Sequence, residues 1–242
     1  MIKLSDIPTT PPKGADKKHL KDLTDQYTDR IGELNEILRA EQKHSLLVIL
    51  QGMDGSGKDG AVKKVFKDCT HFNVDVYAFK KPTEIEFAHD FLWRVHQQVP
   101  AKGNIKIFNR SHYEDILIQR VHGWIDEKRV QQRMAAINAF EKLLTFDNHT
   151  TILKFYLHIS YEQQAIELRE RIDDPDKKWK HNDNDWKERQ RWDDYMRCYE
   201  YAIQHSEIPW DIIPVDERWY RDYLISKKIC ETMEAMNLKY PV

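Results

Sequence analysis

The chain has 242 residues, of which 40% are hydrophobic and 11% aromatic. This length and composition are typical of one globular domain with a sizeable core, alone or with a small appendage. Charged residues reach 32% but nearly cancel to a net charge of −2, so no overall basicity indicates nucleic-acid binding. We therefore expect one folded domain that binds no nucleic acid.

The cysteines and the apolar runs give information about the cellular compartment. Cys69, Cys198 and Cys230 are far apart and form no CxxC pair, which argues against a disulfide framework and against a zinc site. No segment approaches the roughly 18 apolar residues of a membrane span. The N-terminus also lacks an apolar core of signal-peptide length. We expect a cytoplasmic protein that does not bind membranes.

The first two elements are an arm and a helix. Residues 1–16 contain Pro8, Pro11, Pro12 and Gly14 among polar residues, which predicts an extended N-terminal arm, either free or lying along a neighbour. From residue 17 to residue 41, apolar residues recur every three or four positions, as on one face of a long helix. This apolar stripe belongs either to the core or to a surface between subunits. Residues 17–242 are expected to form the single domain.

A phosphate-binding loop follows the first strand. The apolar run 45–50 predicts a buried strand, and Gly52, Gly57 and Lys58 then match the pattern GxxxxGK. In such loops the backbone N–H groups surround phosphate oxygens at the positive end of a helix, here starting near Lys58. The alternative is a tight turn without a ligand. Gly55 and Ser56 lie within this loop and are also expected to bind phosphate.

Asp59 departs from this pattern, which has Ser or Thr after the lysine to ligate Mg²⁺. A carboxylate at this position repels a polyphosphate unless a metal lies between them or the side chain turns away. The metal must therefore be held in another way, and Asp54 inside the loop is the natural substitute.

Two further strands end near the same edge of the sheet. Residues 75–79 predict a strand followed by Lys80 and Lys81. The carboxyl ends of parallel strands share one rim with the ligand crevice, so these lysines either bind phosphate or are solvated charges. Thr83 and Glu86 resemble a capping box that opens a helix carrying Arg94 and ending at Pro100.

The third strand, 105–108, leads into a polar stretch, 109–115. Arg110 is suited to grip a phosphate with two hydrogen bonds. Glu114 or Asp115 could complete a Mg²⁺ site with Asp54, because hard divalent ions take carboxylate oxygens. Alternatively, these two acidic residues only stabilise the first turn of a helix.

The second half continues with alternating helices and strands: helix 126–148, strand 151–159, helix 193–205, strand 210–215 and helix 220–236. Between them, segment 169–191 is the least hydrophobic part of the chain. It predicts a projecting helical hairpin whose cations close over bound phosphates, with a solvated charged face as the alternative. Its basic residues are Arg169, Arg171, Lys177, Lys178, Lys180, Lys187, Arg189 and Arg191.

Several linked motifs occur in order along the chain, at residues 52–60, 79–82, 89–96, 109–115 and 192–196, and residues 214–221 extend the series. Together these stretches resemble the family-2 polyphosphate kinases, in the single-domain branch that accepts AMP or both AMP and ADP. The resemblance covers nearly the whole chain. It implies an α/β fold similar to thymidylate kinase, a P-loop kinase-like three-layer sandwich with a parallel sheet of about five strands and a helical lid at about residues 169–191.

The resemblance also implies site residues. The expected catalytic residues are Asp54, Lys58, Arg110, Asp115 and Arg171. The expected nucleotide and phosphate ligands are Gly55, Ser56, Gly57, Asp59, Lys80, Lys81, Arg94, Asn109 and Arg120. Lys177, Lys178 and Lys180 are expected to bind polyphosphate, and Asp54 with Glu114 or Asp115 to bind Mg²⁺, with Mn²⁺ as a substitute. Some family members have Asp at the position of Asn109, so Glu114 or Asp115 is expected to supply the missing charge.

The implied activity is Mg²⁺-dependent transfer of a phosphoryl group between inorganic polyphosphate and AMP or ADP, with guanine nucleotides as a further option. The acceptor is already an ionised phosphate oxygen, so no general base is required, and catalysis depends on alignment and charge neutralisation. A homodimer or homotetramer is expected from the family. The alternatives are an ATP-dependent nucleoside monophosphate kinase and a non-catalytic module that binds nucleotide or polyphosphate.

Overall fold

Five parallel strands form the central sheet, in the order β2-β3-β1-β4-β5. A computed structural model of the chain describes residues 2–241. The strands are β1 (Ser45–Gln51), β2 (Val74–Ala78), β3 (Ile105–Asn109), β4 (Thr150–His158) and β5 (Trp210–Pro214). Every residue of β1 is buried, as expected for the middle strand of a parallel sheet covered on both faces. The predicted α/β fold with a parallel sheet of about five strands is confirmed.

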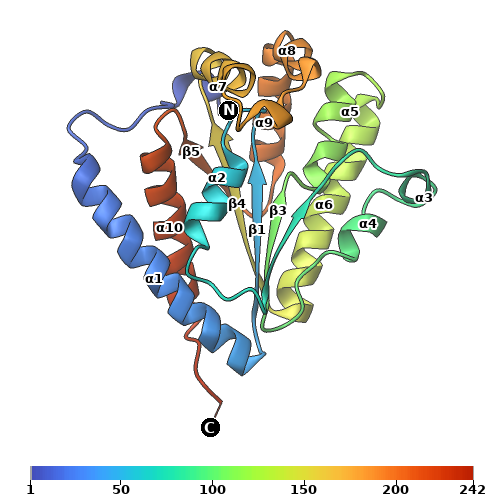
Figure 1. Ribbon diagram of the computed structural model, residues 1–242. Coiled ribbons are helices and arrows are strands. Elements are labelled where there is room, and N and C mark those ends of the chain that lie inside the picture. The colour runs from blue at the N-terminus through green and yellow to red at the C-terminus, as the bar shows by residue number, and fades with distance from the viewer. Residues whose placement is uncertain (1, 242) are drawn as a thin grey trace.

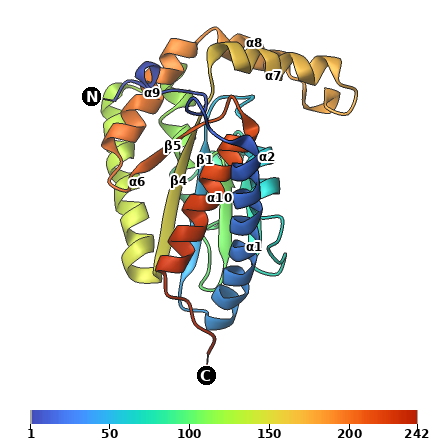
Figure 2. The same ribbon diagram turned by 90° about the vertical axis from the view of Figure 1, so that its left-hand side faces the viewer.

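Helices cover both faces of the sheet (Figure 1). The helices α1 (Lys17–Glu41) and α10 (Arg218–Ala235) lie on one side and α6 (Glu127–Asn148) and α9 (Trp192–His205) on the other (Figure 2). α2 (Lys58–Val65) joins the first group and packs against α10. The apolar stripe of α1 buries Ile31, Leu34 and Leu38 in the core, so much of this face is used within the chain. None of the helices formed by residues 2–241 is both long enough and apolar enough to span a membrane.

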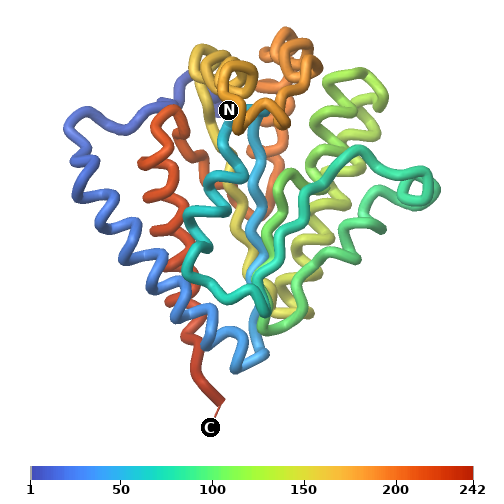
Figure 3. The backbone as a smooth tube through the Cα atoms, viewed as in Figure 1, coloured from blue at the N-terminus to red at the C-terminus, as the bar shows by residue number. Residues whose placement is uncertain are grey.

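The N-terminal arm lies against the carboxyl end of the sheet, opposite the C-terminal end of the chain (Figure 3). Leu4 is fully buried, and its backbone N–H donates to Glu200 at 2.8 Å. His158 Nε2 donates to the carbonyl of Ile7 at 3.1 Å, and the Thr9 hydroxyl donates to Asp216 at 2.7 Å. The arm therefore packs on its own chain.

The prediction of one continuous helix between Thr83 and Pro100 is wrong. Two short helices, α3 (Glu84–Phe87) and α4 (Trp93–His96), stand in its place, although the capping box at Thr83 is confirmed. The Asp90 carboxylate accepts the backbone N–H of Leu92 at 2.9 Å. An aspartate that bonds locally to the backbone competes with helix hydrogen bonds, which explains the interruption.

Three short elements near the site were not predicted. They are the 3₁₀ turn η2 (His112–Asp115), α5 (Ile118–Val121) and the 3₁₀ turn η3 (Lys178–Lys180). The hydrophobic period of so few residues is too short to be recognised in the sequence. The segment 169–191 begins within α7 (Tyr161–Asp173) and includes α8 (Asp183–Arg189). Figure 2 shows α7 projecting from the body of the protein, with α8 beside it.

Candidate active site

The phosphate-binding loop connects β1 to α2 and depends on glycine. Gly52, Gly55 and Gly57 all have positive φ angles, of 152°, 88° and 83°. A Cβ atom at Gly57 would lie 2.2 Å from Nη1 of Arg221, so no larger residue fits there without moving that arginine. The loop leads directly into the N-terminus of α2, with Gly57 as its N-cap, and the N-terminus of a helix favours an anion.

Lys58 is the first residue of α2 and is buried beneath the loop. Its Nζ donates to the carbonyls of Gly52 at 2.8 Å and Met53 at 3.2 Å. Burial and the nearby charge of Arg110 lower the pKa of Lys58 to about 8. The lysine is therefore held in a fixed position. Because its pKa is about 8, its protonation depends on the charge of a ligand that binds beside it.

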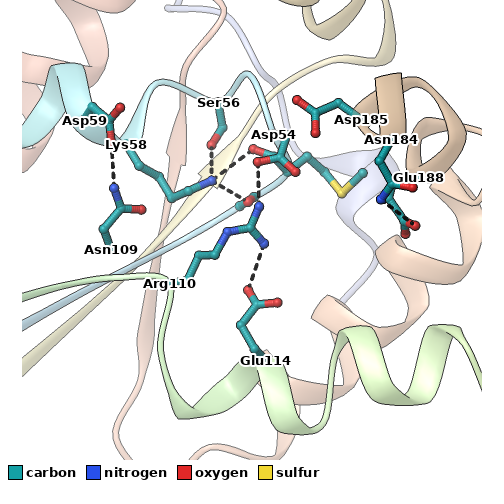
Figure 4. Close-up of polar contacts among 12 residues, drawn as sticks. Asp54, Ser56, Lys58, Asp59, Asn109, Arg110, Glu114, Asn184, Asp185 and Glu188 are labelled. Atoms are coloured by element: carbon teal, nitrogen blue, oxygen red, sulfur yellow. Dashed lines mark hydrogen bonds and ion pairs between the residues drawn. The ribbon is translucent and has the colours of Figure 1, made fainter. Parts of the chain in front are cut away.

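Arg110 links two carboxylates at the mouth of the loop (Figure 4). Its guanidinium lies 2.5 Å from Asp54 and 3.4 Å from Glu114. The charge of Glu114 raises the pKa of Arg110 well above its ordinary value. Burial acts to raise the pKa of Asp54, but the charges of Arg110 and Lys58 outweigh it and hold this pKa below its usual range. Both members of the Arg110–Asp54 pair are therefore charged.

Asp59 points away from this cluster. In Figure 4 it lies with Asn109 on the far side of Lys58 from Asp54, and the Asn109 amide donates to it at 2.6 Å. Its other carboxylate oxygen lies 2.8 Å from Nζ of Lys180. The sequence left two options for this carboxylate: a metal ion between it and the phosphates, or a side chain that turns away from them. The contacts with Asn109 and Lys180 match the second option.

A cavity of about 460 Å³ at the carboxyl ends of the strands brings most of these groups together. Eleven of the predicted site residues line it: Asp54, Gly55, Gly57, Lys58, Asp59, Lys80, Asn109, Arg110, Arg171, Lys177 and Lys180. The three cavity-lining cations from the 169–191 segment have carboxylate partners: Arg171 pairs with Asp185 at 2.7 Å, Lys177 with Glu170 at 2.9 Å and Lys180 with Asp59. Eight Lys and Arg side chains but only four Asp and Glu side chains line this cavity, which leaves an excess of positive charge around the loop.

Other predicted residues do not line this cavity. They are Ser56, Lys81, Arg94, Glu114, Asp115, Arg120 and Lys178. Ser56 and Glu114 stay close to it, through a 3.5 Å contact from Lys58 to Ser56 and the pairing of Glu114 with Arg110. Arg120 instead forms an ion pair with Glu127 at 2.6 Å. Lys178 is exposed.

Arg94 and Asp115 form a separate ion pair at 3.3 Å, in which both side chains are nearly buried. They line a second cavity, of about 420 Å³, together with Phe87 and Phe91. Burial raises the pKa of Asp115. The structure thus does not bring Asp115 together with Asp54, and the metal role predicted for Asp115 stays a prediction.

Sequence reasoning missed two arginines of α10. Arg218 and Arg221 line the first cavity, with Glu167 and Glu170 of α7. Arg221 is nearly buried and donates to the carbonyl of Gly57 at 3.1 Å, and Arg218 pairs with Glu167 at 2.7 Å. One signal was available, since α10 begins just after the carboxyl end of β5, which lies on the same rim as the loop.

Comparison with known proteins places this site in a family. A family model described as polyphosphate kinase 2 matches residues 14–241. The chain belongs to the polyphosphate kinase 2 family. The predicted resemblance is therefore confirmed over nearly the whole chain.

Two curated members of the polyphosphate kinase 2 family illustrate the similarity. The AMP/ADP-polyphosphate phosphotransferase of Meiothermus ruber is 46% identical over 215 residues, covering 88% of this chain and 80% of the relative. The ADP-polyphosphate phosphotransferase of Rhodopseudomonas palustris is 36% identical over 240 residues, covering 93% of this chain and 83% of the relative. A solved structure of polyphosphate kinase 2 from Arthrobacter aurescens has a TM-score of 0.95 at 40% identity, and the match covers 100% of this chain and 88% of that one.

Proposed function

We propose that this polyphosphate kinase 2 transfers a phosphoryl group between inorganic polyphosphate and AMP or ADP. The observation that carries the proposal is the single cavity that joins the loop lysine Lys58, Arg110 and the cations of the 169–191 segment. A long polyanion and a nucleotide phosphate both need such a cationic site. The names of the relatives from Meiothermus ruber and Rhodopseudomonas palustris support the same substrates.

Charge and geometry support the following catalytic roles. The attacking group is an ionised phosphate oxygen, so no side chain has to remove a proton from it. Lys58 and the loop N–H groups hold the transferring phosphate, while Arg110 stabilises the charge that spreads over it. Because Asp54 and Glu114 fix the guanidinium from two sides, Arg110 is aligned before the substrate binds. Arg171 of α7, which also lines the cavity, supplies a further cation.

A divalent metal ion, Mg²⁺ with Mn²⁺ as a substitute, belongs to the proposal. Residues 2–241 contain no cluster of three or more His, Cys, Asp or Glu side chains arranged as a metal site. Mg²⁺ in phosphoryl-transfer sites needs only one or two carboxylates, together with substrate phosphates and water. Asp54 is ionised, about one third exposed and beside the loop, and so fits, with Glu114 as the nearest second carboxylate. When bound, the ion neutralises phosphate charge.

The two substrates are assigned to two directions from the loop. Polyphosphate extends along Arg171, Lys177 and Lys180, and the 169–191 segment acts as its lid. The nucleotide phosphates lie near Lys80, Asn109 and Arg110. The nucleoside enters the second cavity, whose Phe87 and Phe91 offer ring faces for a base; Arg94 connects the two cavities by donating to the carbonyl of Lys80 at 2.9 Å.

Nucleotide chromatography tests this function. Purified protein is incubated with Mg²⁺ and long-chain polyphosphate, with AMP or ADP and without ATP. Formation of ADP and then ATP from AMP is the expected result, and Lys58→Ala should lower its rate by about 100-fold or more. No product from polyphosphate, combined with turnover of ATP plus a monophosphate, would favour the ATP-dependent kinase. Binding without turnover of either donor would favour the non-catalytic module.

The proposal has three further parts, which are the preferred base, the oligomeric state and the cellular location. Adenine nucleotides are taken as the main acceptors, with guanine nucleotides as the alternative to be compared in the chromatography. A homodimer or homotetramer and a cytoplasmic location are carried over from the sequence analysis. Light scattering of the purified protein gives the oligomeric state directly.

A further inference from the structure

A network of charged and polar side chains is buried between the sheet and α6. Glu141 of α6 and Lys154 of β4 are both fully buried and lie 2.6 Å apart. The other carboxylate oxygen of Glu141 accepts from His112 Nε2 at 3.2 Å and contacts the Tyr113 hydroxyl at 3.0 Å. Lys154 also donates to the Tyr113 hydroxyl at 2.7 Å. His112 and Tyr113 are themselves fully buried.

Stability alone does not account for this network. Burying two charges removes them from water, and apolar residues of similar volume often give equal or greater stability in such a place. The network is also incompletely satisfied, because His112 Nδ1 is buried without a hydrogen-bond partner among residues 2–241. These features indicate that the network has a function other than stabilising the fold.

The network is attached to the backbone next to Arg110. His112 and Tyr113 begin the turn η2, which directly follows the pair Arg110 and Ser111. Arg110 has a φ of 61°, in the left-handed region that residues other than glycine rarely adopt. Such strain persists only where the surroundings hold the backbone in place. His112 and Tyr113 supply that hold from one side of Arg110, since both are fixed to α6 through Glu141.

We propose that Glu141 and Lys154, acting through His112 and Tyr113, are positioning residues for Arg110. They keep η2 fixed to the sheet and to α6, and thereby keep the guanidinium of Arg110 aimed at the transferring phosphate. None of the four touches the first cavity. The proposal rests on the role assigned to Arg110 in the proposed function.

The main test replaces the pair by apolar residues of similar size, in the double variant Glu141→Leu/Lys154→Met, which leaves no buried charge and removes the acceptor of His112 and Tyr113. We expect kcat with polyphosphate and AMP to fall about 10- to 100-fold, because small displacements of an aligned group have effects of that size. KM for either substrate should stay within about twofold, since the alignment matters mainly in the transition state. Thermal unfolding should show a folded protein of similar stability.

The matched control is Lys106→Met. Lys106 of β3 is another nearly buried lysine of the sheet, but its partners are Asp75 and Gln98, away from η2. This variant should keep the wild-type kcat. Should the double variant fail to fold, His112→Leu removes one link to η2 and leaves the Glu141–Lys154 pair intact, and it should lower kcat in the same direction.

A double-mutant cycle decides whether the effect passes through Arg110. If it does, the network variant should lower kcat much less in an Arg110→Lys background than in the wild type. Additive losses would overturn the proposal. A folded network variant with wild-type kcat and KM would overturn it as well.

A measurement without substrate separates this proposal from the proposed function. The Nε–H resonance of Arg110 in two-dimensional NMR spectra reports the environment of its guanidinium. It is assigned as the signal that is lost in Arg110→Lys. It should shift in the network variant and stay in place in Lys106→Met. An unshifted signal counts against the network proposal alone, whereas wild-type protein without polyphosphate turnover counts against the function alone.

Discussion

Asp59 and Lys180 join the phosphate-binding loop to the 169–191 segment, with 2.8 Å between Oδ2 and Nζ. Asp59 directly follows the loop lysine, and Lys180 ends the turn η3 of the segment. Burial acts to raise the pKa of Asp59, but hydrogen bonds from Lys180 and Asn109 outweigh it and hold this pKa below its usual range. An ionised carboxylate therefore fastens the segment to the first turn of α2.

Asp59→Asn should loosen this connection without unfolding the protein. Both side chains are at least one third exposed, and exposed pairs contribute up to about 1 kcal/mol, so amide exchange in residues 174–182 should become measurably faster, by up to about fivefold. Hydrogen–deuterium exchange by mass spectrometry measures this without substrate. The control is Lys178→Gln, because Lys178 is exposed and outside the cavity. Equal exchange in Asp59→Asn and the wild type would show that the pair does not hold the segment.

Residues close to a recognisable local pattern were predictable from the sequence. The glycines and Lys58 have fixed spacing, and Arg110 directly follows a strand whose carboxyl end must share a rim with the loop. These relations depend on backbone geometry over a few residues and on the topology of parallel sheets. They place Asp54, Lys58, Asn109 and Arg110 around one cavity.

Side-chain direction was not predictable in the same way. Glu114 and Asp115 are neighbours in sequence, but the turn η2 sends Glu114 to Arg110 and Asp115 to Arg94. Arg221 reaches the carbonyl of Gly57 across 164 positions of the sequence. Both outcomes depend on tertiary packing, and no local rule about charge or spacing contains that information.

Of the three lysines that are predicted to bind polyphosphate, two should contribute more to the binding affinity than the third. Lys177 and Lys180 line the cavity, whereas Lys178 does not. We expect Lys177→Gln and Lys180→Gln to raise KM for polyphosphate. Each variant should also make the slope of log affinity against log salt concentration less steep by about 0.7, which is the effect of losing one contact to a single-stranded polyanion. Lys178→Gln is the matched control. The assignment would be contradicted by three equal effects.

The N-terminal arm should contribute to the stability of the domain. Leu4 is fully buried in the main core cluster, and Leu4→Ala should lower the free energy of unfolding by about 2–5 kcal/mol. Ile2→Ala is the control, because Ile2 is 38% exposed on the same arm and should change little. Urea unfolding followed by circular dichroism measures both. Similar small changes in the two variants would mean that the arm detaches before the domain unfolds.

Polyphosphate binding should be accompanied by proton uptake above neutral pH. The pKa of Lys58 is about 8 in the free protein because of burial and the charge of Arg110, so Lys58 loses its proton as the pH rises through that value. A bound polyanion favours the charged form and raises this pKa. Uptake should therefore be small at about pH 6.5 and clear at about pH 8.5, between the free and the bound pKa. Calorimetric titration of polyphosphate in two buffers with different ionisation enthalpies measures the protons taken up, and Lys58→Met should abolish the difference between the two pH values. If uptake at the higher pH persists in Lys58→Met, another group is responsible and Lys58 is not the residue whose charge responds to the phosphate.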